Sequence, residues 1–441
     1  MIRIFRSRLV RNASWLIAGK IFEMALGLVI SMITARYLGP ANFGSINYAA
    51  SLTAFFTSIC TLGLNGILVK QILENPDRQG EILGTSIVLR LISSAGSVVA
   101  IAAVARILNP GDDVIVLVAV LYSLCVLFQA FDTLQYWYQS NLRSKVYTII
   151  GFIAYATESA YKVYLLASGK SIIWFAVCNS IDNSLIAILL TAHYMRNQGQ
   201  KLTFSKNQAW DLLRQSYHFI ISGMAVAIYG QIATILVKHS MNSTSVGYYS
   251  AALAINNVWS FALAAIVDSA RPAIMQEKDR DRNAYHNRII QLYSLILYLS
   301  FAVALLITVL GKYIILILYG SSFLPALPGL RIISWYTAFS YLGVARSIWL
   351  VSEGLQRYEK YLSLIGAACS ILLNVTLIIP FGVEGAAWAT LATQVLTNFL
   401  APFAFPDLRI NSRMIVSAFN PKHLRTLLSQ GLHFPAEDSK T

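Results

Sequence analysis

Long apolar runs, separated by short polar turns, follow one another along almost the whole chain. Runs such as 83–105, 146–167 and 295–318 each reach the roughly 20 residues that a helix needs to cross the hydrocarbon of a bilayer. Because lipid offers no hydrogen-bond partners, a spanning segment must satisfy its own backbone, and runs of this length do so as α-helices. The pattern predicts an all-α membrane protein with twelve spans, at 13–37, 43–69, 82–107, 114–138, 146–167, 171–195, 213–238, 245–270, 289–318, 329–352, 360–380 and 384–405.

Composition and charge agree with a membrane protein. Of the 441 residues, 56% are hydrophobic and 12% are charged, whereas soluble domains carry about 25% charged residues. The net charge of +14 needs no nucleic acid to explain it. If the N-terminus lies inside, 24 of the 34 Lys and Arg residues fall in cytoplasmic segments and six in outer segments, as the positive-inside rule requires. We expect a multi-pass protein with both termini in the cytoplasm.

The second half of the chain repeats the layout of the first. A shift of 203 residues without a gap superposes a basic tail, a helix, a short turn and a second helix. The matched residues are Leu9, Arg11, Ile17, Gly27, Gly44 and Ala49, which fall on Leu212, Arg214, Ile220, Gly230, Gly247 and Ala252. With six spans per half, both halves begin on the same side, so the repeat is parallel. Transporters built this way bind near the midplane between their halves and alternate between two access states.

The expected organisation follows from the spans and the repeat. It comprises a basic cytoplasmic tail, two pseudo-symmetric six-helix bundles around a central cavity, and a second cytoplasmic tail, at 1–12, 13–200, 201–406 and 407–441. The first apolar run, from Ala13 to about Leu38, is too long for the core of a cleavable signal and has no small-residue cleavage site. We interpret it as the first span.

No sequence pattern indicates catalysis or a bound cofactor. The four cysteines lie in apolar segments without metal-type spacing, and no P-loop pattern is present. The connecting segments are too short for a fused domain that hydrolyses ATP. We expect no metal, no cofactor and no catalytic residue, with energy drawn from an ion gradient or from the gradient of the substrate itself.

Ionisable side chains inside the spans are the candidates for function. Each costs roughly 2.5–3.5 kcal/mol at the centre of a membrane helix, so it must face a cavity, a partner or water. The basic ones are Lys20, Arg90, Lys162 and Arg346, and the acidic ones include Glu23, Glu158, Asp182 and Asp268. Lys20 and Glu23 share one helix face, and so do Glu158 and Lys162, because they lie three and four residues apart.

Polar stripes on other helices indicate the walls of an aqueous cavity. One stripe contains Asn179, Asp182 and Asn183, and another contains Gln129, Asp132 and Gln135 or Tyr136. A cavity with several basic groups suits an anion, because the planar fork of Arg matches a phosphate. Arg90 has no partner in its own helix, which favours a functional role. Asp132 lies near a span end, where an interfacial position is expected.

Each of these assignments has a structural alternative. The two same-face pairs could simply neutralise each other to fix helix packing. Arg36, near a span end, could snorkel to the interface. The acidic groups Glu23, Glu158, Asp182 and Asp268 are candidates for carrying a coupled proton or ion, but structural pairing is the alternative for them also.

Two segments resemble a known family. The first is Ala35–Gly44 (ARYLGPANFG), and the second is Glu353–Tyr358 (EGLQRY), which is followed by Asn374 and by Pro380–Ala389 (PFGVEGAAWA). The first resembles the outer turn between the first two helices of the polysaccharide transporter family, and the second resembles the region around its eleventh helix. This family includes the O-antigen flippases (Wzx type) and belongs to the multidrug/oligosaccharidyl-lipid/polysaccharide (MOP) flippase superfamily.

The resemblance implies a substrate and a set of partners. The expected function is to move oligosaccharide repeat units linked to undecaprenyl diphosphate across the bacterial inner membrane, from the cytoplasmic to the periplasmic leaflet, for O-antigen or capsule. In this setting Arg90, Lys20 and Arg346 are assigned to the diphosphate or to acidic sugars, with Lys162 and Arg36 as further substrate-binding candidates. Expected partners are this lipid-linked oligosaccharide, membrane lipids, and the polymerase and chain-length regulator of the pathway.

Two other functions stay open. A multidrug or cation antiporter of the same fold would favour an acidic cavity, whereas the spans here contain at least as many basic groups. A membrane polymerase or glycosyltransferase of the pathway would need a long outer loop for catalysis, and the outer loops here are short. The only outer acidic pair, Asp112–Asp113, is interpreted as the cap of the helix that follows it.

Overall fold

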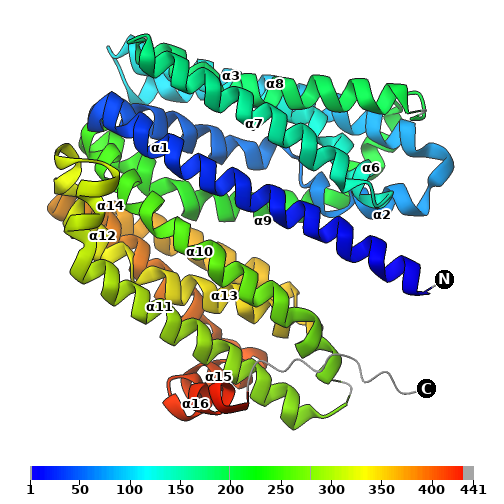
Figure 1. The fold of residues 1–441 in the computed structure, drawn as a ribbon, viewed down its shortest axis with the longest axis vertical. Helices are drawn as coiled ribbons and strands as arrows, with labels where there is room; N and C mark the ends of the chain where they lie inside the picture. The colour runs from blue at the N-terminus through cyan, green and yellow to red at the C-terminus, as the bar shows by residue number, and fades with distance from the viewer. Residues whose placement is uncertain (1, 198, 279, 431–441) are drawn as a thin grey trace. The chain divides into compact units, whose positions relative to one another are not determined.

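The computed structural model describes the backbone of residues 2–197, 199–278 and 280–430, and their side chains except at 2–23, 25 and 427–430. This part of the chain is built of helices joined by short turns, without a strand (Figure 1), which confirms the all-α prediction. Packing groups the chain into two compact units, Met1–Gly247 and Tyr248–Thr441, hereafter unit 1 and unit 2. The predicted division into bundles at 200/201 rests on the repeat and stays a prediction.

Unit 1 is organised around a long first helix. Its helices are α1 (Ile2–Cys60), α2 (Leu68–Glu74), α3 (Gln79–Leu108), α4 (Asp113–Ser123), α5 (Cys125–Gln129), α6 (Thr133–Ser140), α7 (Ser144–Ala167), α8 (Ile172–Arg196) and α9 (Lys206–Ser240), with the start of α10 (Ser243–Glu277). α1 packs along α7 and α9 and also contacts α3 and α4, while α8 packs on α4, α5 and α7 (Figure 1).

The outer turn predicted between the first two spans is a break inside α1. Gly39 has left-handed backbone angles (φ 69°, ψ 173°), which a residue without a Cβ adopts readily, and Pro40 follows it. A similar break interrupts α14 (Arg357–Val395) at Gly382, where φ is 56°. Both breaks lie in the segments that resemble the family. Each contains a Gly beside a Pro or close to one, and these two residue types determine the local backbone geometry.

The repeat is visible in a close backbone contact. A Cβ added to Gly44 would lie 1.8 Å from the carbonyl oxygen of Ser243, and one added to Gly247 would lie 2.1 Å from the carbonyl oxygen of Pro40. The same 203-residue shift that pairs the two glycines also pairs Pro40 with Ser243. The two contacts are therefore equivalent under the 203-residue shift. The parallel pseudo-twofold relation of the two six-helix halves stays a prediction.

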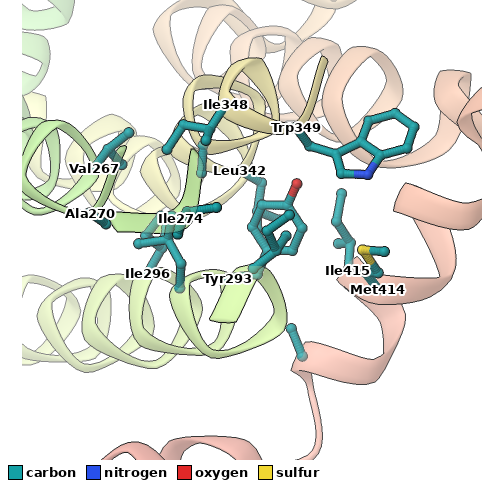
Figure 2. Packing of buried hydrophobic residues seen from close by; sticks show 14 of the residues in the cluster. Val267, Ala270, Ile274, Tyr293, Ile296, Leu342, Ile348, Trp349, Met414 and Ile415 are labelled. Atoms are coloured by element: carbon teal, nitrogen blue, oxygen red, sulfur yellow. The ribbon is translucent and has the colours of Figure 1, made fainter. Parts of the chain in front are cut away.

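Unit 2 contains most of α10 and the remaining helices. These are α11 (Arg282–Leu318), α12 (Leu327–Ile333), α13 (Tyr336–Ser352), α14, a π-helical turn at Leu396–Leu400, α15 (Arg409–Ala418) and α16 (Pro421–Gln430). A large buried cluster joins α10, α11, α13 and α15 through residues such as Val267, Tyr293, Leu342, Trp349 and Ile415 (Figure 2).

Seven helical stretches of the described chain are long and apolar enough to cross a membrane. They are Pro76–Leu108, Asp113–Ser140, Ile172–Arg196, Lys206–Ser240, Ser243–Glu277, Arg282–Leu318 and Arg357–Ala404. The predicted fourth span, 114–138, is not one regular helix, since a 3₁₀ turn at Ala130–Asp132 divides it. The predicted cap at its start is confirmed, because the Asp112 side chain accepts a hydrogen bond from the backbone N–H of Ile115 at 3.1 Å. The protein is thus a multi-pass membrane protein, while the count of twelve spans stays a prediction.

Candidate functional site

A cavity of about 250 Å³ lies inside unit 1, among α1, α4, α7 and α8. Much of its lining is polar although these helices belong to a membrane protein. The polar lining residues are Ser31, Thr34, Asn47, Tyr122, Tyr155, Glu158, Lys162, Asn179 and Asp182. Three residues that the sequence singled out, Glu158, Lys162 and Asp182, therefore come together in one place.

Glu158 and Lys162 form an ion pair in the wall of this cavity. The Lys162 Nζ lies 2.7 Å from the Glu158 Oε1, and the two side chains are 24% and 5% exposed. Both residues are on α7, four positions apart, so the helix itself places them on one face, as predicted. The pair satisfies two charges that would each be costly alone at membrane depth.

The polar stripe on α8 forms the facing wall. Asp182 and Asn179 both line the cavity. The Asn183 amide donates to the backbone oxygen of Asn179 at 2.7 Å, and the Asn179 amide donates to the Cys125 sulfur at 3.3 Å. Two members of the predicted stripe, Asn179 and Asp182, thus line the cavity, and Asp182 adds a second carboxyl group to it.

Arg90 lies outside this lining, in a separate buried cluster. Its side chain, on α3, is 3% exposed, and its Nη2 donates to the Oδ1 of Asn65. Asp132 and the Tyr136 hydroxyl are close enough to interact electrostatically with the guanidinium. Asp132 lies in the 3₁₀ turn that divides the fourth span, and this turn packs against α3, which carries Arg90. Its expected position at the membrane interface stays a prediction.

Arg346 is the buried arginine of unit 2. It is 1% exposed, and its two terminal nitrogens donate to the backbone oxygen and the Oδ1 of Asn398, at 3.0 and 3.1 Å. Asn398 lies in the π-helical turn and donates in turn to Gln394 at 2.7 Å. A π-turn displaces backbone oxygens from the regular helical pattern. Arg346 therefore stabilises an irregular turn, and its assignment to the substrate stays a prediction.

The remaining candidates have varied environments. The side chains of Lys20 and Glu23 lie outside the described residues. Arg36 is exposed and lies just before the break in α1 at Gly39. Asp268 belongs to unit 2, where its side chain is 73% exposed and lies 3.6 Å from Arg271. Their roles as substrate or ion sites stay predictions.

Sequence reasoning did not identify the neutral partners. Asn65, Asn398 and the cavity residues Asn47 and Tyr122 lie on different elements from the charges they accompany. Nothing in their spacing along the chain indicates which charge they will meet. An amide inside a predicted span is the one general signal that could have drawn attention to them.

Comparisons with known proteins agree with this architecture. A solved structure described as the lipid II flippase MurJ, in an inward closed conformation, superposes with a TM-score of 0.69 at 14% identity and covers 91% of each chain. An inward-facing multidrug resistance MATE transporter of the MOP superfamily gives a TM-score of 0.64 at 12% identity, over 89% of this chain and 96% of that one. A MOP superfamily transporter from Pyrococcus furiosus gives 0.53 at 11% identity, over 96% of each chain.

These low identities show a shared fold and no more. No curated protein matches the sequence. A family described as "Polysaccharide biosynthesis protein" does match, over residues 9–278. Because this match extends over more than half of the chain, the resemblance found in the sequence is confirmed, and the protein belongs to the polysaccharide biosynthesis protein family, with the fold of the MOP superfamily transporters.

Proposed function

We propose that this protein is a flippase for oligosaccharide repeat units linked to undecaprenyl diphosphate, and that it moves them from the cytoplasmic to the periplasmic leaflet of the bacterial inner membrane. The observation that carries the proposal is the match to the polysaccharide biosynthesis family. The MurJ structure, which has the same fold, is named for a lipid-linked substrate. The product would serve O-antigen or capsule synthesis, with the polymerase and chain-length regulator of that pathway as partners.

The buried basic groups fit an anionic lipid carrier. A diphosphate that enters the membrane region needs cationic hydrogen-bond donors, and Arg offers a planar fork that matches it. Arg90 is the strongest candidate, because its Nε has no hydrogen-bond partner among the described residues although the side chain is buried. Arg346 is held by Asn398 and would have to release it before it could bind a phosphate.

The cavity of unit 1 is our candidate for ion coupling. Glu158 and Asp182 bring two carboxyl groups to it, and Lys162 neutralises one of them in the described arrangement. A proton or cation that enters would compete with Lys162 for Glu158. Lys162, once released, would have the second carboxyl group of the cavity, Asp182 on α8, as an alternative partner. Such an exchange of partners between α7 and α8 is how we propose that ion binding is coupled to alternating access.

The direct test uses spheroplasts of a deletion strain and an external glycosidase. We expect carrier-linked repeat units to accumulate in a protected form, and to become accessible when the wild-type gene is restored. Accessible but unpolymerised units in the deletion strain would mean that flipping proceeds without this protein, and would favour the polymerase alternative. Drug resistance on overexpression, without any effect on the repeat units, would favour the multidrug antiporter.

A pair of variants on α3 tests the role of Arg90. Arg90→Ala should abolish the appearance of accessible repeat units while the protein remains in the membrane. Arg106→Ala is the matched control, because Arg106 is on the same helix but 60% exposed, where it pairs with Asp113. Unchanged export by the Arg90 variant would remove this residue from the substrate-binding set.

A further inference from the structure

The last two helices, α15 and α16, form a basic element after the final membrane-crossing stretch (Figure 1). Between Leu408 and Gln430 the sequence contains no acidic residue and four Lys or Arg residues. These are Arg409, Arg413, Lys422 and Arg425. Such a local excess of positive charge attracts an anionic surface.

One face of α15 is fixed against unit 2. Met414 and Ile415 enter the buried cluster beside Tyr293 (Figure 2). The Asn411 amide donates to the Tyr293 hydroxyl at 2.7 Å, and the Ser294 hydroxyl donates to the backbone oxygen of Ala418 at 2.8 Å. These bonds determine the rotation of the helix about its axis.

The turn that leads into α15 is also anchored, through Asp407. Asp407 accepts a hydrogen bond from the Tyr358 hydroxyl at 2.6 Å and a charged one from Arg357 at 3.2 Å. At the other end, the Tyr298 hydroxyl donates to the backbone oxygen of Phe419 at 2.5 Å. The opposite face of α15 is therefore presented in a fixed orientation.

The outward face combines apolar and basic side chains. Ile410 and Val416 are 52% and 49% exposed, and Arg409 and Arg413 are exposed beside them. Positions 409, 413 and 416 follow the i, i+4, i+7 spacing of a single helix strip. Water alone does not favour such a strip, whereas the headgroup region of a membrane accommodates both its apolar and its basic groups.

The second helix extends the basic surface. Lys422 and Arg425 of α16 are exposed, and the His423 ring is within hydrogen-bond distance of Ser417 on α15, at 3.2 Å. Because α16 also packs on α11, its position relative to α15 is set by the unit as a whole. The two helices thus present their cations together.

We propose that the outward face of α15 and α16 binds the headgroups of anionic phospholipids in the leaflet that it contacts. The charge excess selects the anionic headgroup, and the exposed Ile410 and Val416 insert among the acyl chains next to it. The contact orients unit 2 against one membrane surface. It is independent of the transported substrate, so it stands or falls separately from the flippase function.

The test reports on the local lipid directly. In the full-length protein, Cys369→Ser removes the one native cysteine that is not buried, and Val416→Cys supplies a site for an environment-sensitive fluorophore. The labelled protein is placed in nanodiscs that contain doxyl-labelled phosphatidylglycerol or doxyl-labelled phosphatidylcholine. We expect half-maximal quenching at a several-fold lower mole fraction of the anionic lipid.

Charge variants identify the cause of this preference. Arg413→Gln combined with Arg425→Gln removes two of the four cations and should abolish most of this several-fold preference for phosphatidylglycerol. Lys201→Gln combined with Lys206→Gln removes the same charge from exposed positions elsewhere and should leave the preference unchanged. Thermal unfolding of both double variants checks that they fold.

Three results would overturn the proposal. Equal quenching by the two lipids would show that the face lies in the membrane without selecting a headgroup. Absence of quenching by either lipid would show that water or another protein covers the face. An equal effect of the two double variants would show that the preference depends on net charge and not on α15 and α16.

Discussion

Replacing Gly44 with alanine would test the contact between the two turns that the repeat places opposite each other. The added methyl group would lie 1.8 Å from the carbonyl oxygen of Ser243 and 2.6 Å from the backbone nitrogen of Gly247. Ordinary contacts of a Cβ begin at 3.4 Å. The clash involves backbone atoms on both sides, so no change of side-chain rotamer can relieve it, and the two turns must separate by more than an ångström.

The cost follows from this separation. Overpacking a well-packed contact typically costs 1–3 kcal/mol, and we expect the upper end, about 3 kcal/mol, because the neighbouring atoms are backbone. Gly247→Ala should cost about as much, since its methyl group would lie 2.1 Å from the carbonyl oxygen of Pro40. One separation relieves both clashes, so the double variant should be destabilised by clearly less than the two single variants together.

The assay is the thermal unfolding midpoint of the detergent-purified protein. Gly96→Ala is the matched control, because Gly96 is also on a membrane helix and a Cβ there would meet nothing within 4 Å. This control should be neutral or stabilised by up to about 1 kcal/mol, the helix-propensity gain of alanine over glycine. A wild-type midpoint for Gly44→Ala would refute the close approach, and strict additivity of the pair would refute a single shared contact.

Three further predictions use the same measurement. Lys162→Ala should destabilise the protein by about 3–5 kcal/mol, because Glu158 is left as a buried charge without its partner. The double variant Lys162→Met with Glu158→Gln should recover most of this loss. An equal loss of stability in the single and the double variant would contradict the prediction. Arg346→Gln should reduce the free energy of unfolding by about 3 kcal/mol, because the charged hydrogen bonds to Asn398 are lost. Asn398→Ala should reproduce much of this effect. A wild-type midpoint for Arg346→Gln would exclude the structural role of this residue. The hydrogen bond from the Tyr358 hydroxyl, together with Arg357, lowers the pKa of Asp407. The stabilisation by the Asp407 carboxylate is therefore complete above the ordinary carboxyl pKa of about 4 and is lost as the pH falls through the lowered value. Asp407→Asn should show a smaller loss of stability in acid than the wild type, and an acid profile identical to wild type would refute this.

Features that depend on neighbouring residues in the chain could be predicted from the sequence. The break at Gly39, the helix cap at Asp112 and the shared face of Glu158 and Lys162 all follow from residue type and short spacing. The fourth span shows the limit of this reasoning. Hydropathy indicates that residues 114–138 are apolar enough to cross, but it does not register the 3₁₀ turn that divides them.

The reciprocal contact of Gly44 and Gly247 could be predicted only in part from the sequence. The 203-residue shift pairs the two glycines but does not say that they touch. The contact forms only when α1 packs against α9 and the start of α10. Both positions can come this close because neither residue has a Cβ.

The sequence by itself determined the membrane class, the helical fold, the family and which ionisable residues fall within apolar segments. It could do so because the cost of placing a side chain or a backbone group in lipid belongs to that group wherever it lies in the chain. Only the tertiary structure decided which partner each charge meets. Arg90 meets Asn65 across 25 residues, and Arg346 meets Asn398 across 52. These partners come from other helices, and the helix packing that brings them together leaves no periodic signal in the chain.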